Sequence, residues 1–330
     1  MRSESLAVSI AAHRRRRSLD ELRACLLEFV AMPREERIAF DPVELPRRYT
    51  HPRDIEVSGL LSASMAYGRA DLFKPKIAAL LEAMGPSPAE FACELTPLRA
   101  RALLGGFIYR FNVGADIAVL LTGAGKAIRE RGSLEALFAE QLSRHGDLHS
   151  ALSGFTAALR SVAIAPIRRE LGPVRGLDHL LPAPLGPGAA KRLNLFLRWM
   201  VRGPEAVDFG IWQTIPPSKL LVPLDTHVGR IARHLGFTHR KDLTWKTAEE
   251  ITSALRQVDP TDPVRFDFAL CHHGMSGACP PRPSRKTCSA CALNEVCLTG
   301  RRILARARNW TTSSSRVADR KTLARTATCT

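Results

Sequence analysis

"LPAPLGPGAAKRLNLFLRWMV", residues 181–201, is the stretch that best indicates the fold class. Its first eight residues include three prolines and two glycines, a composition typical of a turn. From residue 189 onward, apolar side chains recur three and four positions apart, as they do on one face of a helix. The stretch therefore predicts a tight turn that leads directly into a strong helix over 189–201.

The same helical periodicity recurs along most of the chain. Residues 54–85 predict two helices broken near Tyr67-Gly68, and residues 225–236 predict a helix with Asp225 as N-cap and Gly236 as its stop. We find no internal repeat and no run of alternating strands, so the sequence predicts an all-α protein. Further amphipathic helices are predicted at 132–142, 150–162, 246–258 and 263–274.

Composition agrees with this class. The chain has 330 residues, of which 45% are hydrophobic and only 6% aromatic. That length can bury a sizeable core in one large domain or in two modest ones. Low aromatic content and few β-branched runs favour helices over strands.

The net charge of +16 is concentrated at the two ends of the chain. Residues 1–17 carry +4 and residues 301–330 carry +7, which leaves only +5 on residues 18–300. We expect both ends to be disordered basic tails. The charge is compatible with a nucleic-acid partner but does not prove one.

Neither a membrane span nor a secretory signal is predicted. No apolar stretch approaches the roughly 18 to 20 residues that a membrane helix needs. The arginines at 14–17 are not followed by an apolar segment with a cleavage site. We therefore expect a cytoplasmic protein without membrane contact, in a reducing compartment where clustered cysteines are metal ligands rather than disulfides.

Four of the eight cysteines follow the pattern C-x8-C-x2-C-x5-C within residues 279–297. Four thiolates this close together can surround one metal centre, and spacing alone leaves an iron–sulfur cluster and zinc equally open. The loop between the first two also carries three cations, which fit a polyanionic partner. The cysteines are Cys279, Cys288, Cys291 and Cys297, and the cations are Arg282, Arg285 and Lys286.

The cysteine pattern resembles the C-terminal [4Fe–4S] loop of the endonuclease III and adenine-glycosylase branch of the helix-hairpin-helix (HhH-GPD) DNA glycosylases. That branch has C-x6-C-x2-C-x5-C, so the first loop here is two residues longer. "LLSASMAYGRAD" (60–71) is similar to the helix that reaches the DNA lesion, and "PLDTHVGRIARHLG" (223–236) to the segment with the catalytic aspartate.

Over roughly residues 40 to 300, the chain is also similar to an uncharacterised bacterial family, DUF2400. The motifs that carry this likeness are "AYGR", "YRFN", "AKRLNLFLRWMVR", "PLDTHVGRI" and "DPVRFDFAL". The two resemblances together imply a two-lobed helical domain over 18–278, with a hairpin region at about 175–236 and the cysteine loop at 279–297.

The resemblance implies two catalytic residues. Asp225 would stabilise the positive charge that develops on the sugar when an N-glycosidic bond breaks, and the simpler reading is a helix cap. Lys191 would attack the sugar as a neutral amine and form a Schiff base. It lies three residues after Gly188, one later than is usual, so a phosphate contact or a surface position is the alternative.

The remaining candidates are DNA contacts. Gly186 and Gly188 would let a hairpin backbone approach a DNA phosphate, unless "LPAPLGPG" is only a turn between helices. Four side chains would stack on a base or fill the gap left by a flipped nucleotide, unless they belong to the core. These four are Tyr67, Arg69, Tyr109 and Arg110, whereas we expect His227, His272 and His273 to be structural.

These features favour a monomeric enzyme that removes a damaged base from double-stranded DNA, with strand nicking if Lys191 is the nucleophile. It would carry a [4Fe–4S] cluster that presents the basic loop to phosphates. The alternatives are a non-catalytic DNA-binding protein of the same fold and a zinc-stabilised binding module. The sequence does not identify the damaged base, because pocket shape sets that choice.

Overall fold

The structure is a computed structural model, and it describes residues 18–33, 35–183 and 185–305. The described residues are mostly helical, which confirms the predicted class in its coarse form. The predicted basic tails, 1–17 and 301–330, lie outside the described residues except for 301–305, which are helical.

The first half of the chain contains helices α2 to α9 and a short hairpin. The strands β1 and β2 pair antiparallel over only two residues each, with Ile108 opposite Val113. The elements are α2 (Leu19–Ala31), η1 (Glu35–Phe40), η2 (Pro42–Glu44), η3 (Pro46–Arg48), α3 (Pro52–Met65), α4 (Ala70–Met84), α5 (Pro88–Cys93), α6 (Pro97–Leu104), β1 (Ile108–Tyr109), β2 (Asn112–Val113), α7 (Gly114–Arg131), α8 (Leu134–His145) and α9 (Leu148–Arg160).

The second half is also helical and ends in the cysteine loop. Its elements are α10 (Ile164–Leu171), α11 (Leu177–Leu180), α12 (Lys191–Val201), η4 (Pro217–Lys219), α13 (Thr226–Leu235), α14 (Trp245–Val258), η5 (Pro263–Phe266), α15 (Asp267–Met275) and α16 (Arg285–Ser289). Among these helices and those before them, none alone is long and apolar enough to cross a membrane. Helices α9 and α10 pass that test only as a pair, which is bent by 60°.

Local sequence signals account for several helix ends. The predicted break at Tyr67-Gly68 separates α3 from α4, with Gly68 at φ 83°. Helix α13 begins after Asp225, whose side chain accepts two backbone hydrogen bonds, and ends at Gly236 in the left-handed conformation. Both ends follow the prediction, because a carboxylate satisfies free N–H groups and glycine adopts positive φ without strain.

Close backbone packing surrounds the long helix α7. A Cβ atom at Gly123 would collide with the carbonyl of Leu159, and one at Gly125 with the carbonyl of Ala92. Only glycine permits this approach of α7 to the ends of α9 and α5. Helix α7 therefore organises the half of the molecule that contains α3 to α10.

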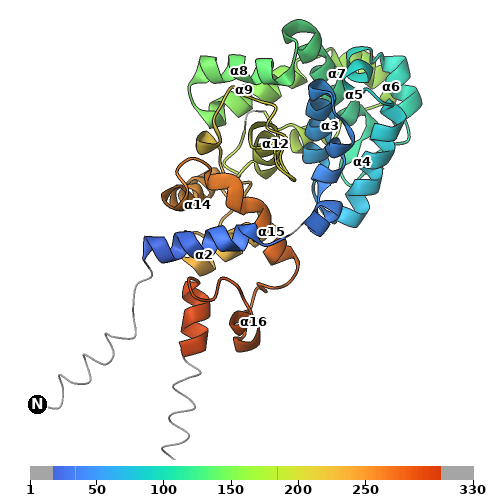
Figure 1. Ribbon diagram of the computed structural model, residues 1–330. Helices are drawn as coiled ribbons and strands as arrows, with labels where there is room; N and C mark the ends of the chain where they lie inside the picture. Colours follow the sequence, from blue (N-terminus) through green and yellow to red (C-terminus); the bar gives the residue numbers. More distant parts are fainter. Residues whose placement is uncertain (1–17, 34, 184, 306–330) are drawn as a thin grey trace, which may run out of the picture.

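The buried apolar side chains form two separate cores. In Figure 1, α3 to α9 lie above α2, α14, α15 and α16. The first core includes α3 to α11 and most of α12. The second core joins the N-terminal α2 to α13, α14, α15 and the cysteine loop, so the two ends of the described chain pack together. The Arg23 Nε of α2 donates to the Val258 carbonyl of α14 at 2.8 Å and ties α2 to this core.

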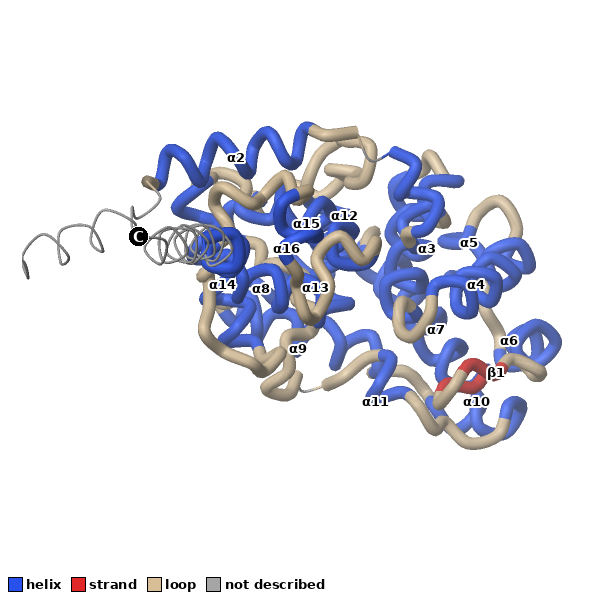
Figure 2. The backbone as a smooth tube through the Cα atoms, turned by 90° about the horizontal axis from the view of Figure 1, so that it is seen from below, coloured by secondary structure: helices blue, strands red, loops and turns tan. Residues whose placement is uncertain are grey.

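The start of α12 lies where the two cores meet. Figure 2 shows α12 between α15 and α3. Ala189 belongs to the second core and Leu193 to the first, so Lys191 lies between them. The chain returns across the same boundary from Leu220 in the first core to Leu224 in the second, just before Asp225. The fold thus brings the starts of α12 and α13 to one boundary.

Candidate functional site

The two predicted catalytic residues lie together at this boundary. Lys191, the first residue of α12, places its Nζ 2.9 Å from Oδ2 of Asp225, the N-cap of α13. Both side chains are reachable from solvent, since 34% of the Lys191 side chain and 16% of the Asp225 side chain are exposed. The ion pair spans 34 positions of sequence and is formed by tertiary packing alone.

Asp225 is held as a carboxylate. Burial alone would raise its pKa, but the Lys191 cation and the Val228 N–H outweigh burial and lower the pKa below its ordinary value. Its Oδ1 accepts hydrogen bonds from the backbone N–H groups of His227 and Val228, each at 2.9 Å. The first turn of α13 therefore keeps this carboxylate charged and fixed in orientation.

Lys191 is held as an ammonium group. Burial pushes its pKa down, but the Asp225 carboxylate more than compensates, and the pKa is raised above the ordinary lysine value. At rest, the side chain is a cation paired with Asp225 rather than a neutral amine.

A third side chain, which sequence reasoning missed, contacts the pair. The Cys271 Sγ lies 3.5 Å from Asp225 Oδ2 and 3.7 Å from the sulfur of Met275. Cys271 belongs to α15 and is separated from Asp225 by 46 positions. No spacing in the sequence signals this contact, because it depends on how α15 packs against α13.

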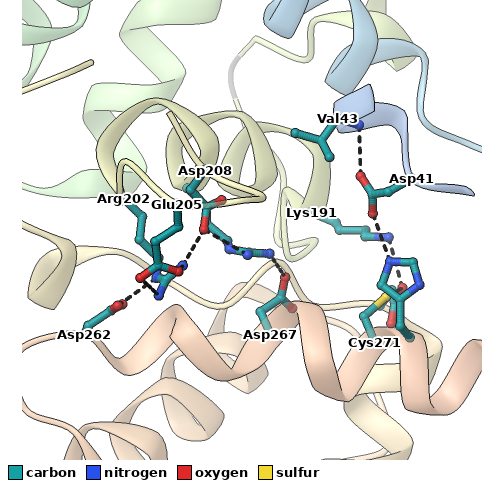
Figure 3. Close-up of polar contacts among 12 residues, drawn as sticks. Asp41, Val43, Lys191, Arg202, Glu205, Asp208, Asp262, Asp267 and Cys271 are labelled. Carbon is teal, nitrogen blue, oxygen red and sulfur yellow. Dashed lines mark hydrogen bonds and ion pairs between the residues drawn. The ribbon is translucent and has the colours of Figure 1, made fainter. Parts of the chain in front are cut away.

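The same face of α12 carries a buried ion-pair network (Figure 3). Residues 191, 198 and 202 are seven and four positions apart, which places them on one side of a helix. Arg198 pairs with Asp208 at 3.0 Å and with Asp267 at 2.9 Å, and its side chain is 2% exposed. Arginines at this spacing in an otherwise apolar helix are a signal that could have predicted buried partners.

Arg202 extends this network beyond Arg198. It pairs with Asp208 at 2.5 Å and with Asp262 at 2.7 Å. Burial raises the pKa of Asp267 to about 6, against the opposing effect of Arg198. The network links the first core to α15 of the second.

A cavity of about 200 Å³ adjoins this network. It is lined by the end of α2 at Val30 and Met32, by Arg198 and Arg202 of α12, and by Phe268 of α15. Arg198 lies seven residues, or about 10 Å of helix, from Lys191. This cavity thus lies toward the other end of α12 from Lys191.

The predicted hairpin loop is held by the segment before α14. The Ala189 N–H donates to the Leu243 carbonyl at 3.0 Å, and the Trp245 N–H donates to the Pro187 carbonyl at 2.9 Å. Gly186 and Gly188 remain exposed, and no atom lies within 4 Å of where their Cβ atoms would be. Neither glycine has positive φ, so packing and backbone strain within the described structure do not require glycine at either position.

Three of the four predicted stacking residues gather around the β1–β2 hairpin. The Tyr67 ring stacks on Phe111 at 5.7 Å with 13° between the planes, and Phe111 is 50% exposed. Tyr109 is buried, and its hydroxyl donates to the Tyr67 carbonyl, which supports the core reading for this residue. Arg110 lies over the rings of Tyr67 and Phe111, whereas Arg69 is exposed and pairs with Asp71.

Two neighbours of these rings were not predicted. The Arg192 guanidinium lies 5.2 Å from the centre of the Tyr67 ring, and burial lowers the pKa of Arg192 to about 10. Burial, together with Arg192 and Arg110, lowers the pKa of His179 to about 4, so this imidazole is neutral at pH 7. Arg192 follows Lys191 in sequence, so the first turn of α12 carries both a member of the ion pair and a neighbour of the aromatic group.

The four predicted cysteine ligands line one pocket, together with His234 and Asn294. The Gly300 N–H donates to the Cys297 sulfur at 3.2 Å, and the Leu293 N–H donates to the Cys291 sulfur at 3.4 Å. Burial raises the pKa of Cys279 to about 11, with Arg230 opposing and the neighbouring thiols adding to the rise. Within the described ranges, no three Cys, His, Asp or Glu side chains are grouped as ligands of a single metal ion.

The basic loop faces solvent. Arg282, Arg285 and Lys286 are all exposed. Ser284 caps the short helix α16 through the backbone of Thr287, which fixes the path of the loop. Three cations are therefore available to an outside partner.

The three histidines expected to be structural all have contacts. His272 pairs with Asp41 at 3.2 Å, and the His273 Nε2 lies 3.5 Å from the Cys291 sulfur. The ring of His227 lies near Arg230, with Nδ1 3.2 Å from the guanidinium. His273 is thus the one that borders the cysteine pocket.

Comparison with known proteins identifies a family but no characterised relative. The family described as a protein of unknown function, DUF2400, matches residues 41–276, which include α3 to α15 and the Lys191–Asp225 pair. No curated protein and no solved structure matches the chain significantly. The match covers more than half of the chain and all of the first core, so the chain belongs to the DUF2400 family.

Proposed function

We propose that the chain is a DNA glycosylase of the helix-hairpin-helix type, which removes a damaged base from duplex DNA. The observation that carries the proposal is the 2.9 Å pairing of Lys191 Nζ with Asp225 Oδ2. A charged carboxylate and an amine in contact, at a boundary between two cores, are the groups that this reaction requires.

Asp225 would act on the sugar. Breaking the bond between C1′ and the base leaves positive charge on the sugar ring, and a fixed carboxylate nearby stabilises that charge. The low pKa of Asp225 keeps it ionised at neutral pH, as this role needs. The carboxylate serves equally well to orient a nucleophile.

Lys191 would be the nucleophile if the enzyme also nicks the strand. Its ammonium group must first lose a proton, and Asp225 Oδ2 lies within reach to accept it. The bond from Nζ to C1′ then forms as the bond to the base breaks, and the base leaves with the electron pair and takes up a proton. A water molecule in place of Lys191 would give excision without nicking.

The surrounding residues would hold the DNA. Gly186 and Gly188 are exposed glycines without an internal requirement for glycine, so a DNA phosphate could approach their backbone closely. Phe111, Tyr67 and Arg110 offer a partly exposed aromatic face with a cation over it, which suits stacking on a base.

The four cysteines would hold a [4Fe–4S] cluster. All four cysteines line one pocket, which suits four ligands of a single centre, and the resemblance to the glycosylase loop favours a cluster over zinc. The cluster would supply rigidity to the loop, and Arg282, Arg285 and Lys286 would contact phosphates.

Protein purified without oxygen should accordingly be brown, with about four iron atoms per chain. Cys288→Ser or Cys291→Ser should bleach the protein and lower its thermal stability, whereas Cys93→Ser, at a thiol far from the loop, should leave the colour unchanged. A stable, colourless preparation with stoichiometric zinc, made with iron in excess, would refute the cluster.

Borohydride trapping on a panel of duplexes with different damaged bases tests the chemistry of Lys191. Wild-type protein should release one class of base and form a covalent adduct, and Lys191→Ala should form none. An adduct that persists in Lys191→Ala would assign the Schiff base to another amine. Base release without any adduct in wild type would mean that water is the nucleophile.

A DNA-binding protein that has lost excision is the second candidate. The raised pKa of Lys191 favours it, because an ammonium group locked to Asp225 cannot attack the sugar. Binding to damaged duplexes without release of any base from the panel would support this candidate and contradict the glycosylase.

A further inference from the structure

The carboxylate of Asp225 has a filled set of hydrogen-bond donors. Oδ1 accepts from the N–H groups of His227 and Val228, and Oδ2 accepts from Lys191 Nζ. The fourth donor is the Cys271 thiol, 3.5 Å from Oδ2. A carboxylate offers about four acceptor positions, so this arrangement uses all of them.

Cys271 stays protonated in this position. Burial and the charge of Asp225 raise the pKa of its thiol well above the ordinary value, against the opposing effect of Lys191. A protonated thiol is a weak but real donor, and the neighbouring Met275 sulfur offers no competing charge. The thiol has one hydrogen and two acceptors within reach, and the charged Oδ2 that also binds Lys191 is a stronger acceptor than the neutral Met275 sulfur.

The two hydrogen-bond donors to Oδ2 have different roles in the proposed reaction. Lys191 must leave Oδ2 in order to reach the sugar, whereas Cys271 has no such role. We propose that Cys271 is a positioning residue that holds Oδ2 of Asp225 in place once Lys191 has left it. This inference rests on the proposed function, but the contact that it uses does not.

Because charged groups surround Asp225, each hydrogen-bond donor to its carboxylate affects its pKa. Lys191 faces it from α12, His227 from α13, and the Cys271 thiol and Asp267 from α15. The negative charges of Asp267 and Asp225 repel each other, and Asp41 adds a further negative charge near Cys271. Loss of a donor from Oδ2 therefore destabilises the carboxylate and raises its pKa.

The titration of Asp225 tests this role without any substrate. In full-length protein with ¹³C-labelled aspartate, Asp225→Asn identifies the Asp225 signal. Cys271→Ala should raise the Asp225 pKa by about 0.5 to 1 pH unit, and Cys271→Ser, which keeps a donor, should restore it. Cys93→Ala, which removes a half-buried thiol bonded to the Gly125 carbonyl, should leave the titration unchanged.

A second variant reproduces the state in which Lys191 has left. In a Lys191→Met background, Cys271→Ala should raise the Asp225 pKa by more than it does in wild type, because no other side chain then donates to Oδ2. An Asp225 titration that Cys271→Ala leaves unchanged in both backgrounds would overturn the proposal. So would an equal rise in Cys93→Ala.

Excision kinetics supply the functional half of the test. On a lesion that the enzyme accepts, Cys271→Ala should slow single-turnover excision about tenfold and shift the acidic limb of the pH–rate profile to higher pH. Lesion binding should be unchanged, and Cys271→Ser should restore both the rate and the limb. A wild-type rate and limb in Cys271→Ala would overturn the proposal. Excision at the wild-type rate in Asp225→Asn would instead refute the proposed function.

Discussion

At the scale of single residues, the site combines one charged pair with one neutral histidine. Lys191 and Asp225 each stabilise the charged form of the other. By contrast, burial and the cations of Arg192 and Arg110 keep His179 neutral. The histidine can therefore border the aromatic group without adding charge where a base would stack. Protonation of His179 should also affect the stability of the folded protein.

His179 should make the protein less stable in mild acid. Its folded pKa of about 4 lies below the unfolded value of about 6.5, so between these values the unfolded chain binds the proton first. Stability should fall as pH drops from 6.5 towards 4, and His179→Gln should remove part of this loss. Thermal unfolding across this range measures the effect, with His239→Gln, at an exposed histidine, as control; parallel curves for wild type and His179→Gln would contradict it.

The residues that sequence reasoning found and missed differ in a physical way. Asp225 has a local signature, because a cap and its helix are adjacent in sequence. Cys271 and Phe111 have none, since their partners are 46 and 44 positions away. Buried and exposed tyrosines look alike in sequence, so the core position of Tyr109 could be expected only as an alternative.

At the scale of elements, α12 is the helix that positions Lys191. Its residues from Leu193 to Val201 are all buried, so it is a core helix rather than an amphipathic surface helix. It carries Lys191 at one end and the Arg198 network along the same face. The network fixes the rotation of α12 and thereby the direction of Lys191.

Removing Arg198 should be costly. Arg198→Ala leaves Asp208 and Asp267 buried without their shared cation, and should destabilise the protein by about 3 to 5 kcal/mol. Arg131→Ala breaks ion pairs with Glu130 and Glu140 at the surface and should cost no more than about 1 kcal/mol. Denaturant unfolding compares the two variants, and equal losses would show that the network contributes little.

Helix positions were predictable because periodicity and caps are local. The break between α3 and α4 and both ends of α13 follow from glycines and a carboxylate within a few residues. The short β1–β2 hairpin was not predicted, because two residues per strand give no alternation to detect. Which helices meet at the Lys191–Asp225 boundary depends on packing between two cores, and no local pattern specifies it.

At the scale of the whole molecule, most of the net positive charge lies on the two ends of the chain. Residues 18–300 carry only +5 of the net +16, so any affinity of these residues for the proposed DNA partner depends on where their cations are placed. The exposed cations belong to the cysteine loop, which packs on the second core, and Asp225 lies between Leu224 and Val228 of that core. If the proposed function holds, these cations should add to DNA affinity.

Replacing Arg282, Arg285 and Lys286 with alanine should weaken binding to all duplexes alike. Each lost phosphate contact lowers the slope of log affinity against log salt by about 0.9, so the triple variant should lose up to about 3. A matched variant with Lys76, Arg168 and Arg169 replaced, on α4 and α10, removes the same charge from the first core and should change the slope less. Equal slopes for wild type and the loop variant would show that the loop faces away from DNA.

The most direct test of the central claim is the rate of base release by Asp225→Asn on a lesion that the wild type accepts. Asparagine has the same size and can still cap α13, so folding and lesion binding should persist. The charge that stabilises the sugar cation is lost, so single-turnover excision should fall by several orders of magnitude. Excision by Asp225→Asn at the wild-type rate would contradict the account.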